Sequence, residues 1–193
     1  MIFNVKFETS VFTADKIIDT DKKQIVLVGK SNVGKSSFIN SITNNSKLAK
    51  VGNTPGKTRC LNYYNVHDDF YIVDMPGYGY SKMSLGEKKA VQKLVDKYLD
   101  SGMISYIFFL VDIRHKPTSD DRHMYDYLIE TGIPFTIVAN KLDKIGRSKV
   151  NEHIDDITKT LFASEKIIPY SGEKKVNVDL VCDIITKVIA DED

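Results

Sequence analysis

The sequence has no tryptophan, only two cysteines and almost no net charge. Cys60 and Cys182 match no metal-binding or CxxC spacing, which argues against a zinc site or a disulfide framework. With a formal net charge of +1, charge alone gives no reason to expect binding to nucleic acid or to a membrane. The longest apolar run, Ile104 to Asp112, is too short to span a membrane, and the first ten residues contain no signal-peptide core. We therefore expect a cytoplasmic protein with no membrane partner.

The 193 residues instead show a regular alternation of strand-like and helix-like segments, at the length of one domain. Such alternation predicts an α/β fold with a mostly parallel sheet. A polar turn at residues 67–69 predicts a hairpin, and hence one antiparallel pair. Residues 44–57 have no periodicity and are predicted to form a mobile loop. We expect strands at 24–28, 61–66, 70–73, 104–111, 133–139 and 167–169, and helices at 34–43, 84–100, 119–130, 149–162 and 176–189.

The segment 29–36 reads GKSNVGKS and fits the pattern GxxxxGK[ST] between a predicted strand and a predicted helix. Its glycines let the backbone wrap around phosphates with N–H groups pointing inward, and the helix N-terminus adds a favourable dipole. Lys35 is expected to bridge the β- and γ-phosphates, and the Ser36 hydroxyl to bind Mg²⁺. The sequence therefore predicts a nucleoside triphosphate site here.

A second motif, Asp74-Met75-Pro76-Gly77, follows the next predicted strand of the hairpin. An aspartate at a strand end can hold Mg²⁺ through a water molecule. The glycine can present its backbone N–H to the γ-phosphate. Thr58, in the loop before the hairpin, is favoured as a second hydroxyl ligand for Mg²⁺, and Thr54 is the alternative.

A third motif, Asn140-Lys141-Leu142-Asp143, follows the strand predicted at 133–139 and indicates which base is bound. Guanine offers two adjacent N–H donors that a single carboxylate, Asp143, can accept. Adenine lacks those donors and would leave the carboxylate unpaired. Asn140 can bond another polar edge of the base, and the stem of Lys141 can lie along the base or sugar. The turn Tyr170-Ser171-Gly172 can add a backbone N–H to guanine O6.

Three further segments carry a resemblance to a known family: TPGKTR at 54–59, DMPGYGYSK at 74–82 and DIRHKP at 112–117. With the motifs above, they resemble the EngB (YihA/YsxC) family within the TRAFAC class of P-loop GTPases. The predicted fold is a three-layer P-loop NTPase of the Ras-like type. It has a mostly parallel six-stranded sheet with one antiparallel strand. Residues 1–193 are expected to form a single GTPase domain, with 1–23 as an N-terminal extension packed on it.

The resemblance implies slow, Mg²⁺-dependent hydrolysis of GTP to GDP by a nucleotide-dependent switch. The switch is expected to act in assembly of the large ribosomal subunit, with its RNA and proteins as partners, and in cell division and septation. We expect a monomer. One departure from the family is Arg59-Cys60, where many members carry Gln and another residue. The residues expected to line GTP or GDP are Gly29, Lys30, Ser31, Asn32, Val33, Gly34, Lys35, Ser36, Gly56, Lys57, Thr58, Arg59, Cys60, Asp74, Met75, Pro76, Gly77, Asn140, Lys141, Leu142, Asp143, Tyr170, Ser171 and Gly172.

Lys35, Asn32, Thr58 and Gly77 are the residues expected to support hydrolysis. Tyr78 stands where Ras-like enzymes place a glutamine that orients water, which predicts slow hydrolysis. Related GTPases with asparagine at the position of Asn32 suggest a bound K⁺ ion, whose charge would stabilise the transition state. The alternative is that Asn32 only braces the loop through hydrogen bonds.

Two other functions stay open from the sequence. A small P-loop kinase is disfavoured by the guanine-reading motif, and a polymerising or division-apparatus GTPase by the lack of a coiled-coil extension or membrane helix. Lys89, Lys93 and Lys97 share one face of a predicted helix and suggest either an RNA contact or, with Asp96 and Asp100 on the same face, an ordinary solvated surface.

Overall fold

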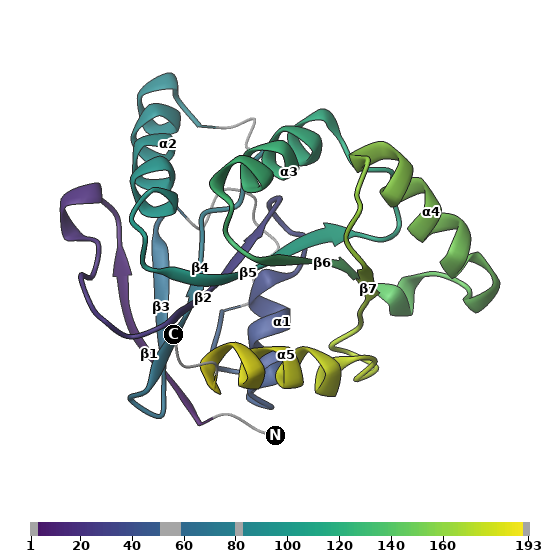
Figure 1. The fold of residues 1–193 in the computed structure, drawn as a ribbon, viewed down its shortest axis with the longest axis horizontal. Helices are drawn as coiled ribbons and strands as arrows, with labels where there is room; N and C mark the ends of the chain where they lie inside the picture. Colours follow the sequence, from purple (N-terminus) through teal and green to yellow (C-terminus); the bar gives the residue numbers. More distant parts are fainter. Residues whose placement is uncertain (1–3, 51–58, 80–82, 191–193) are drawn as a thin grey trace.

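The computed structural model describes residues 4–50, 59–79 and 83–190, and Figure 1 shows their arrangement. The expected residues Thr54, Gly56, Lys57 and Thr58 lie outside this part of the chain, as do residues 80–82 of the GYGYSK segment.

The strands are β1 (Val5–Val11), β2 (Gln24–Gly29), β3 (Leu61–Val66), β4 (Phe70–Asp74), β5 (Ile104–Asp112), β6 (Phe135–Asn140) and β7 (Ile167–Pro169). The α-helices are α1 (Lys35–Ile42), α2 (Leu85–Leu99), α3 (Ser119–Thr131), α4 (Val150–Leu161) and α5 (Val178–Ala190). Short 3₁₀ helices are η1 (Ala14–Lys16), η2 (Leu142–Lys144) and η3 (Arg147–Lys149).

The strands form one sheet in the order β1-β3-β4-β2-β5-β6-β7. Only β3 runs against the others, since it pairs antiparallel with both β1 and β4, while the remaining pairs are parallel. This confirms the α/β fold class and the single antiparallel strand. The sheet has seven strands in the described residues, one more than expected, because the N-terminal segment contributes β1.

A bulge explains why the sequence pattern did not reveal β1. The register against β3 shifts between Phe7 and Thr9, which interrupts the alternation of inward and outward side chains. As a result, Val5 packs into the core on one face of the sheet and Val11 into the core on the other. Phe7 stays half exposed, with its ring edge-on to Tyr64 at a centroid distance of 5.7 Å. No period-two pattern therefore marks this edge strand.

Helices cover both faces of the sheet, which gives the three layers seen in Figure 1. The core on one face includes Leu94 and Tyr98 of α2, with side chains of α3 and α4. The core on the other face includes Phe38 of α1 and Ile185 of α5. The buried strand β2 alternates between the two cores, so no residue of β2 faces solvent. Cys60 and Cys182 are both free and buried.

Residues 44–50, the described part of the loop expected at 44–57, contain no helix or strand. This part is nevertheless held against α1 by Asn40. The Asn40 amide donates to Ser46 O at 3.2 Å and to Ala49 O at 2.9 Å, and its Oδ1 accepts from Ala49 N at 2.8 Å. Ala49 is buried in consequence. The sequence pattern gave no sign of this anchor.

Candidate nucleotide site

The loop between β2 and α1 has glycines at positions where a side chain would prevent close packing of the backbone. Gly34 has a φ of 109°, and a Cβ there would lie 2.4 Å from Asn140 Nδ2. Gly29 ends β2, and a Cβ there would lie 2.7 Å from Leu110 O. Asn32 also adopts a left-handed conformation, with φ of 63°. Residues 29–36 therefore form a tight turn whose last residues, Lys35 and Ser36, begin helix α1, an arrangement suited to phosphate.

Beneath this turn, Lys35 and Asp74 form a buried pair. Lys35 Nζ lies 3.2 Å from Gly29 O, to which it donates, and 3.8 Å from Asp74 Oδ1. Burial lowers the pKa of Lys35, and the carboxylate of Asp74 opposes that effect. Burial likewise raises the pKa of Asp74 to about 6, with Lys35 opposing. The Asp74 Oδ1 atom is buried without a hydrogen-bond partner among the described residues, so the pair is incomplete without a further group.

The segment after Asp74 lies directly against the phosphate loop. A Cβ on Gly77 would approach Ser31 N to 2.9 Å, so only glycine fits at this contact. Ser31 N donates to Tyr78 O at 3.0 Å. The Tyr78 hydroxyl donates to Asp121 Oδ1 of α3 at 2.7 Å, and burial with this carboxylate raises the pKa of Tyr78 well above its ordinary value. The phenol is thus bound to α3, which fits the expectation that Tyr78 does not orient water.

The base-reading motif contacts the phosphate loop from the other side. Asn140 is buried, and its Nδ2 donates to Val33 O at 3.0 Å. Ser171 Oγ donates to Asp143 Oδ1 at 2.6 Å, while Asp143 Oδ2 lies 3.0 Å from Lys144 Nζ. A cavity of about 610 Å³ opens here. Its lining includes Gly34, Ser37, Asn140, Lys141, Asp143 and Gly172.

The expected residues do not all present their side chains to this site. Tyr170 is fully buried, with its hydroxyl 2.5 Å from Ser41 Oγ and its ring 4.9 Å from that of Phe38. Its carbonyl accepts from Leu142 N at 3.0 Å, so Tyr170 supports the base-reading turn from below. Cys60 is buried at the start of β3, and burial raises its thiol pKa. Arg59 forms an ion pair with Glu87 at the start of α2.

Asp112 is a residue of this site that the motif search missed. It ends β5 and accepts from Lys141 Nζ at 2.9 Å. The signals in the sequence were its place in the DIRHKP segment and an acidic residue at the carboxyl end of a buried parallel strand, where ligand sites in such sheets gather.

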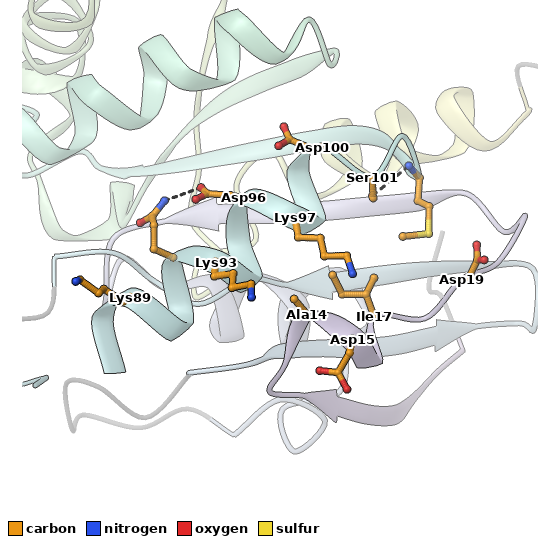
Figure 2. Close-up of a pocket in the computed structure, with 12 residues that line it drawn as sticks. Ala14, Asp15, Ile17, Asp19, Lys89, Lys93, Asp96, Lys97, Asp100 and Ser101 are labelled. Atoms are coloured by element: carbon orange, nitrogen blue, oxygen red, sulfur yellow. Dashed lines mark hydrogen bonds between the residues drawn. The ribbon is translucent and has the colours of Figure 1, made fainter. Parts of the chain in front are cut away.

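A second hollow lies between α2 and the N-terminal segment, and Figure 2 shows its lining. Its volume is about 880 Å³. Lys89, Lys93 and Lys97 line it from α2, as expected for one helix face. Four carboxylates line the same hollow. Its surface is therefore not uniformly positive, and its charge does not favour binding of RNA. These carboxylates are Asp15, Asp19, Asp96 and Asp100.

Known proteins of similar sequence are described as GTP-binding. The family described as 50S ribosome-binding GTPase matches residues 24–141. A probable GTP-binding protein EngB of Finegoldia magna is 39% identical over 191 residues, 97% of this chain and 95% of the relative. The protein of the same name in Mycoplasma mycoides is 40% identical over 98% of both chains.

Among solved structures, a probable GTP-binding protein engB superposes with a TM-score of 0.69 at 24% identity, over 86% of this chain and 98% of that one. Era in complex with MgGDPNP and a piece of 16S ribosomal RNA gives 0.68 at 29% identity, over 89% and 58%. NFeoB of S. thermophilus bound to GDP.AlF4⁻ and K⁺ gives 0.58 at 29% identity, over 89% and 64%.

The fold and the three converging motifs define a P-loop GTPase, an enzyme that hydrolyses GTP. Within this class, the chain belongs to the EngB family of GTP-binding proteins. No helix in the described parts of the chain is long and apolar enough to cross a membrane.

Proposed function

We propose that GTP binds with its phosphates in the loop 29–36 and its guanine in the cavity beside Asp143. The observation that carries this proposal is the convergence of Lys35, Asp74, Gly77 and Asn140 on one loop, with an unpartnered buried oxygen on Asp74. Lys35, at the start of α1, would bridge the β- and γ-phosphate oxygens. Asp143 accepts the two guanine donors, and Ser171, which donates to Oδ1, holds the carboxylate in place.

The residues present also fit Mg²⁺. The unpartnered Asp74 oxygen is a hard anionic group of the kind that holds Mg²⁺ through water. The Ser36 hydroxyl makes no hydrogen bond to other described residues and is available as a direct ligand. Thr58 is the second proposed ligand. When bound, Mg²⁺ neutralises charge between the β- and γ-phosphates.

In the cell, we propose a cytoplasmic, monomeric switch for large ribosomal subunit assembly, with a further role in cell division and septation. The family description and the ribosomal RNA in the Era complex support the ribosomal partner. Bound GTP would complete a surface that docks on the subunit precursor, and hydrolysis would release it.

Co-sedimentation with large ribosomal subunits tests this switch. We expect retention with a non-hydrolysable GTP analogue and release with GDP. Asp143→Asn is the matched control, because an amide can donate to the carbonyl that xanthine carries at C2. Its retention should require the xanthosine analogue instead. Equal retention in all nucleotide states would reject the switch.

We further propose that K⁺ assists hydrolysis next to Asn32. The Asn32 side chain makes no hydrogen bond within the described residues, which disfavours a purely bracing role. The NFeoB structure contains both K⁺ and a transition-state mimic. Because Tyr78 is bound to Asp121, a fixed cation would supply charge stabilisation that the enzyme otherwise lacks.

Steady-state GTPase rates at equal concentrations of KCl and NaCl, with saturating Mg²⁺, test the role of K⁺. We expect faster hydrolysis in KCl, and Asn32→Ala should abolish the difference. Equal rates in the two salts for the parent protein would end the proposal.

A further inference from the structure

A chain of polar contacts runs from the surface to the phosphate loop, and its outer residues, Asp112 and Arg114, do not line the nucleotide cavity. It begins where β5 ends. Asp112 is paired in register with Asn140, and Ile113 N donates to Asn140 O at 3.0 Å. This pairing places the Asp112 carboxylate beside the first residues of the base-reading motif, where its Oδ2 accepts from Lys141 Nζ at 2.9 Å.

Lys141 links this carboxylate to the phosphate loop. The same Nζ donates to Asn32 O at 2.7 Å, while Asn140 Nδ2 donates to the next carbonyl, Val33 O, at 3.0 Å. Two consecutive carbonyls of the loop are therefore held by two consecutive residues of the motif. Lys141 itself has a left-handed backbone, with φ of 68°. Because this conformation is uncommon for residues other than glycine, the contacts of Lys141 must hold it in place.

Arg114 in turn fixes Asp112. Its Nε donates to Oδ1 at 2.9 Å and its Nη2 to Oδ2 at 2.7 Å, a planar fork that sets the orientation of the carboxylate. The backbone N–H of Arg114 adds a bond to Oδ1 at 3.1 Å. Burial disfavours the ionised carboxylate, but the hydrogen bonds from Arg114 and Lys141 outweigh it and lower the pKa of Asp112 to about 2. At neutral pH Asp112 is thus an anion held between two cations.

We propose that Asp112 and Arg114 are positioning residues, which hold Lys141 on the phosphate loop and thereby slow the release of guanine nucleotide. Neither residue lines the cavity of about 610 Å³, so both act through Lys141. The inference rests on the proposed nucleotide site. It adds a second layer, Asp112 and Arg114, behind the residues that line the cavity.

Release of a fluorescent GDP derivative from the full chain, measured with excess unlabelled GDP, tests the proposal. Arg114→Ala should speed release by about three- to tenfold, the range expected for hydrogen bonds to a charged group that is partly exposed. Arg114→Lys should lie between, since lysine supplies charge but no fork. Lys116→Ala is the matched control: it removes the same charge two residues away, where the Lys116 ammonium pairs with Asp156 of α4 at 3.3 Å. It should leave the rate unchanged.

A double-mutant cycle with Lys141→Ala separates action through Lys141 from general loosening. Lys141→Ala should speed release, and adding Arg114→Ala should then have little further effect. An Arg114→Ala effect that persists in full without Lys141, or that Arg114→Lys fails to reduce, would overturn the inference. So would normal release from Arg114→Ala while Lys141→Ala is impaired. If Lys141→Ala itself releases GDP normally, the proposed nucleotide site fails as well.

Discussion

The backbone conformation of Gly34 determines whether the phosphate loop can pack against Asn140. Its φ of 109° is costly for any residue with a Cβ, and a Cβ would collide with Asn140 Nδ2 at 2.4 Å. We expect Gly34→Ala to lower the unfolding free energy of the nucleotide-free protein by at least about 1 kcal/mol and to weaken GDP binding at least tenfold. Urea unfolding and equilibrium GDP titration measure the two effects.

Gly86 is the matched control for that substitution. It lies in the first turn of α2, and a Cβ there would meet nothing within 4 Å. Gly86→Ala should therefore stabilise the protein by roughly 0.5–1 kcal/mol and leave GDP binding unchanged. Similar effects from both substitutions would show that close packing at Gly34 is not what the site requires.

Asp112 predicts a pH dependence whose sign follows from its lowered pKa. An acid whose pKa falls from an ordinary 3.8 to about 2 on folding stabilises the protein above pH 4 and loses that contribution as pH falls through 2. Asp112→Asn should therefore lower the unfolding free energy by roughly 2 kcal/mol at pH 7 and by the same amount at pH 5.

Below pH 4 the difference between Asp112→Asn and the parent should shrink. Urea unfolding of both proteins at pH 7, 5 and 3 measures it. A difference that grows on acidification would mean that Asp112 is not held as an anion by Arg114 and Lys141.

At the scale of elements, the sequence pattern identified all the strands and helices that carry a regular apolar period. Strand β5 and helix α3 agree with their predicted bounds to within one residue. Their buried faces give the sequence a clear pattern of apolar residues, which marks where each element begins and ends. β1 was missed, because its bulge places Val5 and Val11 on opposite faces. Helix α5 begins at Val178 and not at 176, after residues in left-handed conformation at Lys175 and Asn177.

The site was predictable where its residues are contiguous in sequence. The three motifs each occupy one loop at the carboxyl ends of parallel strands, so their chemistry could be read from short segments. The ion pairs of Asp112 could not, because they depend on the register of β5 against β6. Nor could the sequence show that Tyr170 turns its ring into the core beside Phe38.

The N-terminus of helix α3 is capped by Thr118, and the contribution of this cap to stability can be tested. Thr118 accepts from Asp121 N at 3.4 Å, and the Asp121 carboxylate accepts from Thr118 N at 2.7 Å, which forms a capping box. Lys30 Nζ of the phosphate loop also donates to Thr118 Oγ1 at 3.2 Å. Thr118→Ala should therefore cost about 1 kcal/mol of unfolding free energy.

Ser119→Ala, one residue further into α3, provides the control for this cap. Ser119 is exposed and should tolerate the change within about 0.5 kcal/mol. Urea unfolding of both variants decides the matter. Equal stability of the two would show that the cap contributes nothing measurable.

At the scale of the whole molecule, the site and the N-terminal strand lie in one continuous sheet. β1 is joined to β3 by six residue pairs, and β3 is followed in the sheet by β4, β2 and then β5. The nucleotide loops follow β2, β4, β6 and β7. The strands between β1 and these loops, β3 and β4, contribute side chains to both hydrophobic cores of the sheet. We therefore infer that the described residues, 4–50, 59–79 and 83–190, unfold as a single cooperative unit.

Hydrogen exchange with bound nucleotide tests this unit directly. A ligand at 100 times its dissociation constant adds about 2.7 kcal/mol to the unfolding free energy of everything that unfolds with its site. GDP at that level should slow the most protected amides of β1 and β6 by the same factor, about 100-fold, because both would exchange only on global unfolding. ADP at the same concentration should slow neither. If GDP protects β6 and leaves β1 unchanged, then the N-terminal strand opens on its own and the seven strands are not one folding unit.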